Sequence, residues 1–184
     1  NILEGLIFTM DTVMVDMGDE LIDFGIPFIG GLSPDAQYYY ILNYKTLQLQ
    51  KVDLDSLKLT ETFILEKDGP NSPGFTFTFQ PLSKGRFFFP HSLRPSILQE
   101  SGEKIRSWNL NPGDILNGLP VDPGSITNRI IFNTTLDQLY SLPVNYKTRE
   151  YYFAVLDSLG ERKKILELPK FHKANRFTIS TGGG

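Results

Sequence analysis

Cysteine is absent from this chain of 184 residues, and histidine occurs twice. Without cysteine there can be no disulfide, zinc–thiolate site, iron–sulfur cluster or cysteine nucleophile. The histidines, His91 and His172, stand alone, because neither has a second histidine at the short spacing that metal motifs use. The sequence therefore predicts no metal site and no cofactor, and it contains no serine-hydrolase or phosphate-loop motif.

Strong net charge and long apolar runs are also missing. The chain carries 18 Lys and Arg against 21 Asp and Glu, a net charge of −3. This balance gives no positive field for a polyanion, so a nucleic-acid partner is not expected. No apolar stretch approaches the ~20 residues that span a bilayer, so no transmembrane segment is expected. Because the chain starts at Asn1 and ends in three glycines, we expect a processed or excised product.

Hydrophobic residues make up 40% of the chain, enough for one globular domain with its own core. Apolar residues at helical spacing are nearly absent, and short runs rich in aromatic and β-branched residues dominate instead. Clusters of Gly, Pro, Asp and Ser separate these runs, as expected of turns between strands. The sequence therefore predicts an all-β chain. The main runs are 12–16, 38–42, 75–79, 86–89, 129–132 and 151–155.

An internal repeat suggests the architecture. The tetrapeptide Asn-Tyr-Lys-Thr at 43–46 recurs at 145–148, an offset of 102, or twice 51. About four short strands in ~50 residues is the size of a β-propeller blade. A β-sandwich, which also has short strands at regular spacing, is the alternative. The expected blades are roughly 24–66, 74–110 and 128–168, after a strand or hairpin at 7–23 and before the start of a further blade at 177–180.

Three to three and a half blades do not close a ring, because propellers usually contain four to eight. An open end would expose a long apolar sheet face. We therefore expect this chain to be a portion of a longer propeller, or to complete its ring with another chain, either a different protein or a second copy of itself.

Three segments together resemble a known family: 10–16, then 32–40 with 52–55, then 65–75. They are similar to the N-terminal half of an uncharacterised family of bacterial envelope lipoproteins, a domain of unknown function with a six- or seven-bladed propeller. The resemblance covers roughly residues 8–110. It implies a location in the periplasm or on the surface of a Gram-negative bacterium. The family has no established activity, so the resemblance assigns no catalytic residue.

Candidate site residues follow from the meander topology expected of a blade. Turns between strands 1–2 and 3–4 lie on one face, whereas the 2–3 loops and the connections between blades lie on the other. The second face has the longer loops, and function concentrates in such loops. Its connections include Lys67 and Asp68. The candidate ligand-binding residues are Asn43, Tyr44, Lys45, His91, Arg94, Trp108, Asn145, Tyr146, Lys147, His172 and Arg176.

Amide, aromatic and cationic groups of this kind could bind a protein, a peptide or a glycan. The leading hypothesis is therefore a non-enzymatic binding module of the cell envelope. A second hypothesis is a glycan hydrolase or lyase that uses His91, Arg94 or Tyr146 at the same face. A third is a purely structural fragment, in which Tyr44 and Tyr146 are repeated blade residues and the loops are simply solvated. The sequence spacing assigns a catalytic role to no single residue of the enzyme hypothesis.

Overall fold

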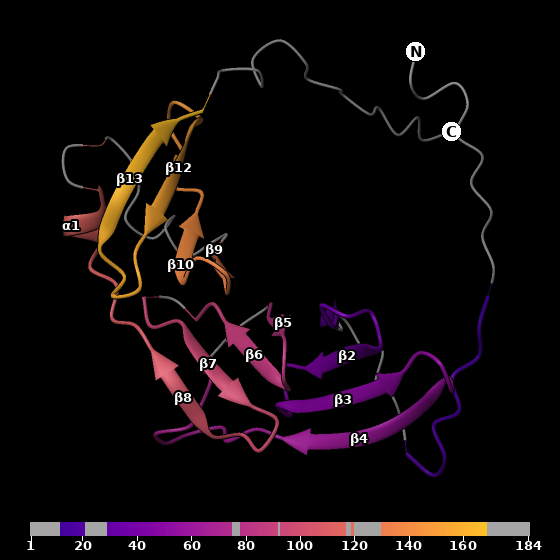
Figure 1. The fold of residues 1–184 in the computed structure, drawn as a ribbon. Coiled ribbons are helices and arrows are strands. Elements are labelled where there is room, and N and C mark those ends of the chain that lie inside the picture. The colour runs from indigo at the N-terminus through magenta and orange to yellow at the C-terminus, as the bar shows by residue number, and fades with distance from the viewer. Residues whose placement is uncertain are drawn as a thin grey trace, which may run out of the picture.

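The computed structural model describes residues 12–20, 29–74, 78–91, 93–116, 119 and 130–168. Within these ranges the chain forms three antiparallel sheets of consecutive strands, which confirms the all-β prediction with propeller-type blades. Figure 1 shows the first sheet beside the second and the second beside the third, in the order of the chain. The expected start of a further blade at 177–180 lies outside the described residues.

The first sheet is a meander in which each strand pairs with the next through a tight turn. Of the segment 7–23, where a strand or hairpin is expected, the structure describes residues 12–20, which make a parallel bridge between Asp16 and Lys58. The rest of that segment lies outside the described residues. Val15 and Met17 pack against Ile41 and Val52 on the same sheet. The strands are β1 (Ile29–Leu32), β2 (Tyr38–Asn43), β3 (Gln48–Asp53) and β4 (Lys58–Ile64).

The second sheet repeats the meander, with strand order β5-β6-β7-β8. Its first strand begins at Gln80, after the aromatic run expected at 75–79, of which 75–77 lie outside the described residues. The strands are β5 (Gln80–Leu82), β6 (Arg86–Phe89), β7 (Ser96–Gln99) and β8 (Lys104–Ser107).

The third sheet is a meander whose second strand is interrupted. Both β10 and β11 pair with β12, and Leu142 and Pro143 separate them. Proline lacks the N–H that a sheet ladder needs, which explains the break. A short helix, α1 (Pro112–Leu116), precedes the sheet, with proline at its first position, where no N–H is required. The strands are β9 (Ile130–Asn133), β10 (Gln138–Ser141), β11 (Val144–Asn145), β12 (Glu150–Leu156) and β13 (Arg162–Glu167).

The second sheet is buried on both faces, which is how the three sheets form one body. Successive side chains of a strand point to opposite faces. Phe87 and Phe89 accordingly pack with the first sheet, whereas Phe88 packs with the third. All three rings are at most 1% exposed. The run of phenylalanines in β6 thus supplies the centre of two separate cores.

Candidate functional site

The repeated asparagines build turns. The side-chain Oδ1 of Asn43 accepts hydrogen bonds from the amides of Lys45 (3.0 Å) and Thr46 (3.2 Å). Asn145 repeats this pattern with the two residues at the same offsets, at 3.0 and 3.1 Å. Each turn ends on a residue with positive φ, Leu47 at 54° and Arg149 at 58°. These carboxamide oxygens therefore hold the backbone, as asparagine does in many turns.

The same turn design occurs at the opposite ends of the sheets. Asp53 Oδ1 accepts from the amide of Ser56 at 2.7 Å, and Leu57 follows with φ 54°. Asn133 Oδ1 accepts from the amides of Thr135 and Leu136, both at 3.0 Å. The tetrapeptide repeat therefore encodes a turn geometry shared by both ends of the sheets, and does not by itself mark a ligand site.

A pocket of about 420 Å³ lies where the β2–β3 turn meets the connection from β4 to β5. We call it the loop-end pocket. It combines Tyr44 and Lys45, both predicted from the sequence, with charged residues of the connection. Leu47, which is 7% exposed, adds an apolar side chain to the lining. The lining residues are Tyr44, Lys45, Leu47, Lys67, Asp68, Gly69, Ser72 and Gly74.

The connection that walls the loop-end pocket is fixed by its own hydrogen bonds. Glu66 Oε2 accepts from the amide of Asn71 at 2.9 Å, and the Ser72 hydroxyl donates to the Lys67 carbonyl at 2.7 Å. The Lys104 ammonium, from β8, donates to the Ser72 carbonyl at 2.6 Å. The wall is therefore formed before any ligand binds, which reduces the ordering that binding requires.

Three charged side chains at the rim lack a partner within the described part of the chain. Lys45, Lys67 and Asp68 are exposed, and their side chains have no hydrogen-bond or ion-pair partner among the residues that the structure describes. Two cations and one anion leave an excess of one positive charge at the rim. His91 lies against the wall: a Cβ added to Gly74 would be 2.4 Å from its Cδ2 atom. The structure thus brings Tyr44, Lys45 and the neighbourhood of His91 together.

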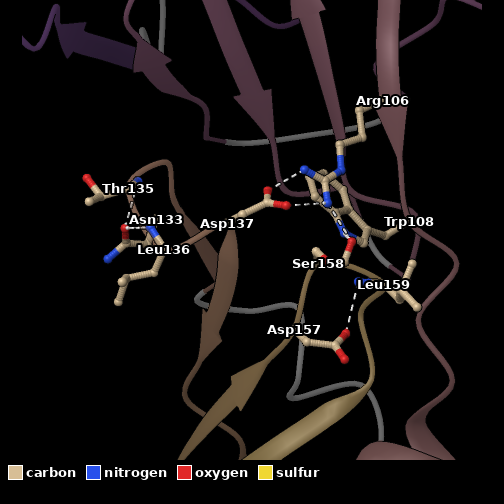
Figure 2. A network of polar contacts seen from close by, with 9 residues as sticks. All are labelled: Arg106, Trp108, Asn133, Thr135, Leu136, Asp137, Asp157, Ser158 and Leu159. Carbon is tan, nitrogen blue, oxygen red and sulfur yellow. Dashed lines mark hydrogen bonds and ion pairs between the residues drawn. The ribbon is translucent and has the colours of Figure 1, made fainter.

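The third sheet is held to the second by a polar network (Figure 2). Arg106, on β8, forms an ion pair with Asp137 in the β9–β10 turn and donates to the Ser158 carbonyl in the β12–β13 turn. Its guanidinium carbon lies 4.4 Å from the centre of the Trp108 ring. The Trp108 indole N–H donates to the same carbonyl at 3.0 Å. The end of the third sheet that carries the β9–β10 and β12–β13 turns therefore meets the carboxyl end of β8.

This contact changes the expected grouping of the candidate residues. Successive turns of a meander lie at alternate ends, so the β11–β12 turn with Asn145, Tyr146 and Lys147 is at the end of the third sheet that points away from β8 (Figure 1). None of these three residues lines the loop-end pocket. The expectation of one loop-rich face shared by all three sheets must therefore be corrected.

The expectation that Trp108 lies on the ligand-binding face must also be corrected. Its side chain is 4% exposed and packs with Phe88 and Phe132, so it belongs to the core rather than to a ligand surface. Arg94 is exposed in the β6–β7 loop and does not line the loop-end pocket. His172 and Arg176 lie outside the described residues.

Sequence reasoning missed Arg106, and it missed Tyr40, Lys51 and Glu100, which lie together between the first and second sheets. A lysine within a strand, as Lys51 is, could have drawn attention. In the described ranges no group of three or more His, Cys, Asp or Glu could hold a metal ion. Nor is any described helix long and apolar enough to cross a membrane.

The chain matches one family model and is similar in structure to several solved proteins. The family model of DUF4221, a domain of unknown function, matches residues 3–184. A DUF4221 family member from Bacteroides vulgatus is similar in structure, with a TM-score of 0.42 and 16% identity over 77% of this chain and 42% of that one. The β-propeller domain of Cps50 (Swd1) from Myceliophteria thermophila gives 0.44 and 11% over 77% and 42%.

A protein of unknown function from Bacteroides caccae gives a TM-score of 0.41 and 14% identity over 76% of this chain and 48% of that one. The chain therefore spans less than half the length of each of these three structures. No curated protein matches it.

Proposed function

The chain belongs to the DUF4221 family, a domain of unknown function, and we propose that it is a non-enzymatic binding module that takes an anionic glycan in the loop-end pocket. The observation that carries this proposal is the pair of lysines, Lys45 and Lys67, which line a preformed pocket and have no ion-pair partner among the described residues. Its volume of about 420 Å³ lies within the range of small-ligand pockets.

The chemistry of the lining fits a sugar acid. The two ammonium groups can donate hydrogen bonds to ligand carboxylates, and charge-assisted bonds of this kind are strong. The Tyr44 ring offers an apolar surface for the C–H face of a sugar, and Asp68 can accept from a ligand hydroxyl. The lining comes from a turn and a connection, so it offers no open strand edge to which an extended peptide could add. This favours a glycan over a peptide.

The proposal also places the module in the bacterial envelope, in the periplasm or on the cell surface. This part rests on the resemblance of 10–16, 32–40 and 65–75 to envelope lipoproteins. Fractionation of a cell that makes the full-length protein tests it. Recovery with the periplasm or the outer membrane is expected, and recovery in the cytosol would contradict the placement.

Calorimetric titration with two trisaccharides tests the binding. Trigalacturonic acid should bind, and maltotriose, which has the same length but no carboxylate, should not bind at this pocket. The double substitution Lys45→Gln and Lys67→Gln should weaken binding of the acid about 5- to 30-fold, since each exposed charge pair contributes about 0.5–1 kcal/mol. Reducing ends should not increase during incubation, because no cleavage is proposed.

Lys147→Gln is the matched control. Lys147 occupies the same place in the repeated tetrapeptide as Lys45, but does not line the pocket. Its substitution should leave the affinity unchanged. Equal loss of affinity with Lys147→Gln, or no binding of trigalacturonic acid to the unsubstituted chain, would contradict the proposed function.

A further inference from the structure

A second pocket, of about 410 Å³, lies between the first and second sheets, at the end of these sheets opposite to the loop-end pocket. We call it the turn-end pocket. It is bounded by the β1–β2 turn at Ser33, the β5–β6 turn at Lys84 and the β7–β8 turn at Glu100, with Tyr38, Tyr40 and Lys51 from strands β2 and β3. Neither its position nor its residues overlap with those of the loop-end pocket.

The carboxylate of Glu100 is fixed in this pocket through one of its oxygens. The Tyr40 hydroxyl donates to Glu100 Oε1 at 3.1 Å, and the Lys51 ammonium lies 3.1 Å from the same oxygen. Lys51 is itself held, 3.4 Å from Glu61 and 4.5 Å from the centre of the Tyr38 ring. Its side chain is 12% exposed. These contacts come from the first sheet, so they set the carboxylate before a ligand arrives.

The protonation states of the two donors are also fixed. Burial, and next the charge of Glu100, raise the pKa of Tyr40 well above its usual range, so it remains a hydroxyl donor. Burial opposes the charge on Lys51, but hydrogen bonds to Glu100 and Glu61 outweigh it and raise the pKa of Lys51. Both donors therefore keep their protons over the neutral range.

Several polar atoms of the pocket are left for a ligand. Glu100 Oε2 accepts no hydrogen bond from the described residues, and the contacts made by Glu100 use Oε1. The Tyr38 hydroxyl and the Lys84 ammonium likewise have no partner in the described part of the chain. The free set contains a strong acceptor, a strong donor and a hydroxyl that can act as either.

Charge decides the class of ligand. The lining contains two ammonium groups, Lys51 and Lys84, and two carboxylates, Asp35 and Glu100, so it is neutral overall. A charged ligand would meet a like charge inside the pocket, whereas sugar hydroxyls both donate and accept and can satisfy both signs. Tyr38 and Leu82 add apolar surface beside these groups, as a sugar's C–H face requires.

We propose that the turn-end pocket binds a neutral sugar ring, with ligand hydroxyls donating to Glu100 Oε2 and accepting from Lys84. The site is separate from the loop-end pocket and does not depend on the proposed function. The pair of pockets lets one chain hold a neutral and an acidic sugar at opposite ends of the same two sheets.

Saturation-transfer NMR and calorimetry with a panel of neutral sugars (glucose, galactose, mannose, N-acetylglucosamine and maltotriose) test this site. Tyr38→Phe removes one hydroxyl, and Lys84→Asn removes the ammonium while suiting the positive φ of 62°. Each should weaken binding about three- to tenfold, the loss expected for one hydrogen bond. Unfolding curves check that both variants fold.

Tyr39→Phe is the matched control, because Tyr39 follows Tyr38 in β2 and packs on the other face of the sheet. It should leave the affinity unchanged, as should the double substitution Lys45→Gln and Lys67→Gln. Three results would overturn the proposal: no saturable binding of any panel sugar up to tens of millimolar, unchanged affinity in both pocket variants, or loss of sugar binding when Lys45 and Lys67 are replaced.

Discussion

Arg106 and Asp137 face each other across the junction of the second and third sheets, with both guanidinium amino groups directed at one carboxylate. The pair also helps to hold the third sheet in its orientation. Because Asp137 ends the β9–β10 turn and the same guanidinium reaches the Ser158 carbonyl, two turns of the third sheet are held against β8 (Figure 2). The orientation of the third sheet, and hence the place of its loops, depends on this contact.

Arg106→Lys should destabilise the fold although it keeps the charge. A lysine ammonium cannot bond two carboxylate oxygens and a carbonyl at once, nor stack on Trp108 as the planar guanidinium does. We expect a loss of about 1–2 kcal/mol in the free energy of unfolding, measured with urea. Arg94→Lys, at an exposed loop position, is the control and should change stability little. Equal urea midpoints for Arg106→Lys and the unsubstituted chain would contradict this role.

A substitution in one of the two cores beside the second sheet should leave the packing of the other core unchanged. Phe88 lies 5.9 Å from Trp108, between ring centres, whereas Phe87 packs on Tyr40 at 4.8 Å. Phe88→Leu and Phe87→Leu should each destabilise by about 1–2 kcal/mol. Because Trp108 is the chain's one tryptophan, Phe88→Leu should shift its fluorescence and Phe87→Leu should not. A similar shift in both variants would contradict the assignment of faces.

Much of the fold could be read from the sequence. Aromatic and β-branched runs with turn residues between them predicted strands, and the run of phenylalanines at 87–89 lies in β6. The break at Pro143 was less visible, because a proline between two strand-like stretches can equally begin a new turn. The tetrapeptide that recurs after 102 residues identified two turns of equal geometry. The same turn at Asp53 and Asn133 shows that local hydrogen bonding also produces this geometry without the tetrapeptide.

The candidate site was harder to predict, because its residues come from segments that only the packing of sheets brings together. Tyr44 and Lys45 were predicted, but their neighbours depend on how the connection at 66–74 folds back. Trp108 was placed at a loop surface because it follows a strand end, yet the approach of the third sheet buries it. The orientation of that sheet rests on Arg106, and nothing in the sequence pattern links Arg106 to Asp137.

Arg149→Gly should stabilise the chain. Arg149 adopts φ 58° at the end of the β11–β12 turn, a conformation that strains residues with a side chain. Glycine relieves that strain but loses more chain entropy on folding, so we expect a net gain of about 0.5–1 kcal/mol. Lys147→Gly, in the same turn and without positive φ, is the control and should not stabilise. Thermal unfolding measures both, and a lower midpoint for Arg149→Gly would contradict this reading of the turn.

Tyr40 should make stability fall at alkaline pH. Its pKa in the folded chain is raised by burial and by Glu100, so above pH 10 the unfolded chain releases this proton while the folded chain keeps it. The stabilisation is therefore complete below pH 10 and is lost as the pH rises toward the folded value. Relative to Tyr40→Phe, the unsubstituted chain should lose stability between pH 9 and pH 11 in urea unfolding. Parallel pH profiles for the two proteins would contradict the burial of this hydroxyl.

The most direct test of the binding account compares the two tyrosines of the repeated tetrapeptide. Tyr44 and Tyr146 have the same sequence neighbours and follow asparagines with the same hydrogen bonds, but Tyr44 lines the loop-end pocket and Tyr146, which is 56% exposed, does not. The measurement is the calorimetric affinity for trigalacturonic acid after Tyr44→Ala and after Tyr146→Ala. The account predicts a loss of about tenfold with the first and no change with the second. Equal affinities in the two variants, or a loss confined to Tyr146→Ala, would contradict it.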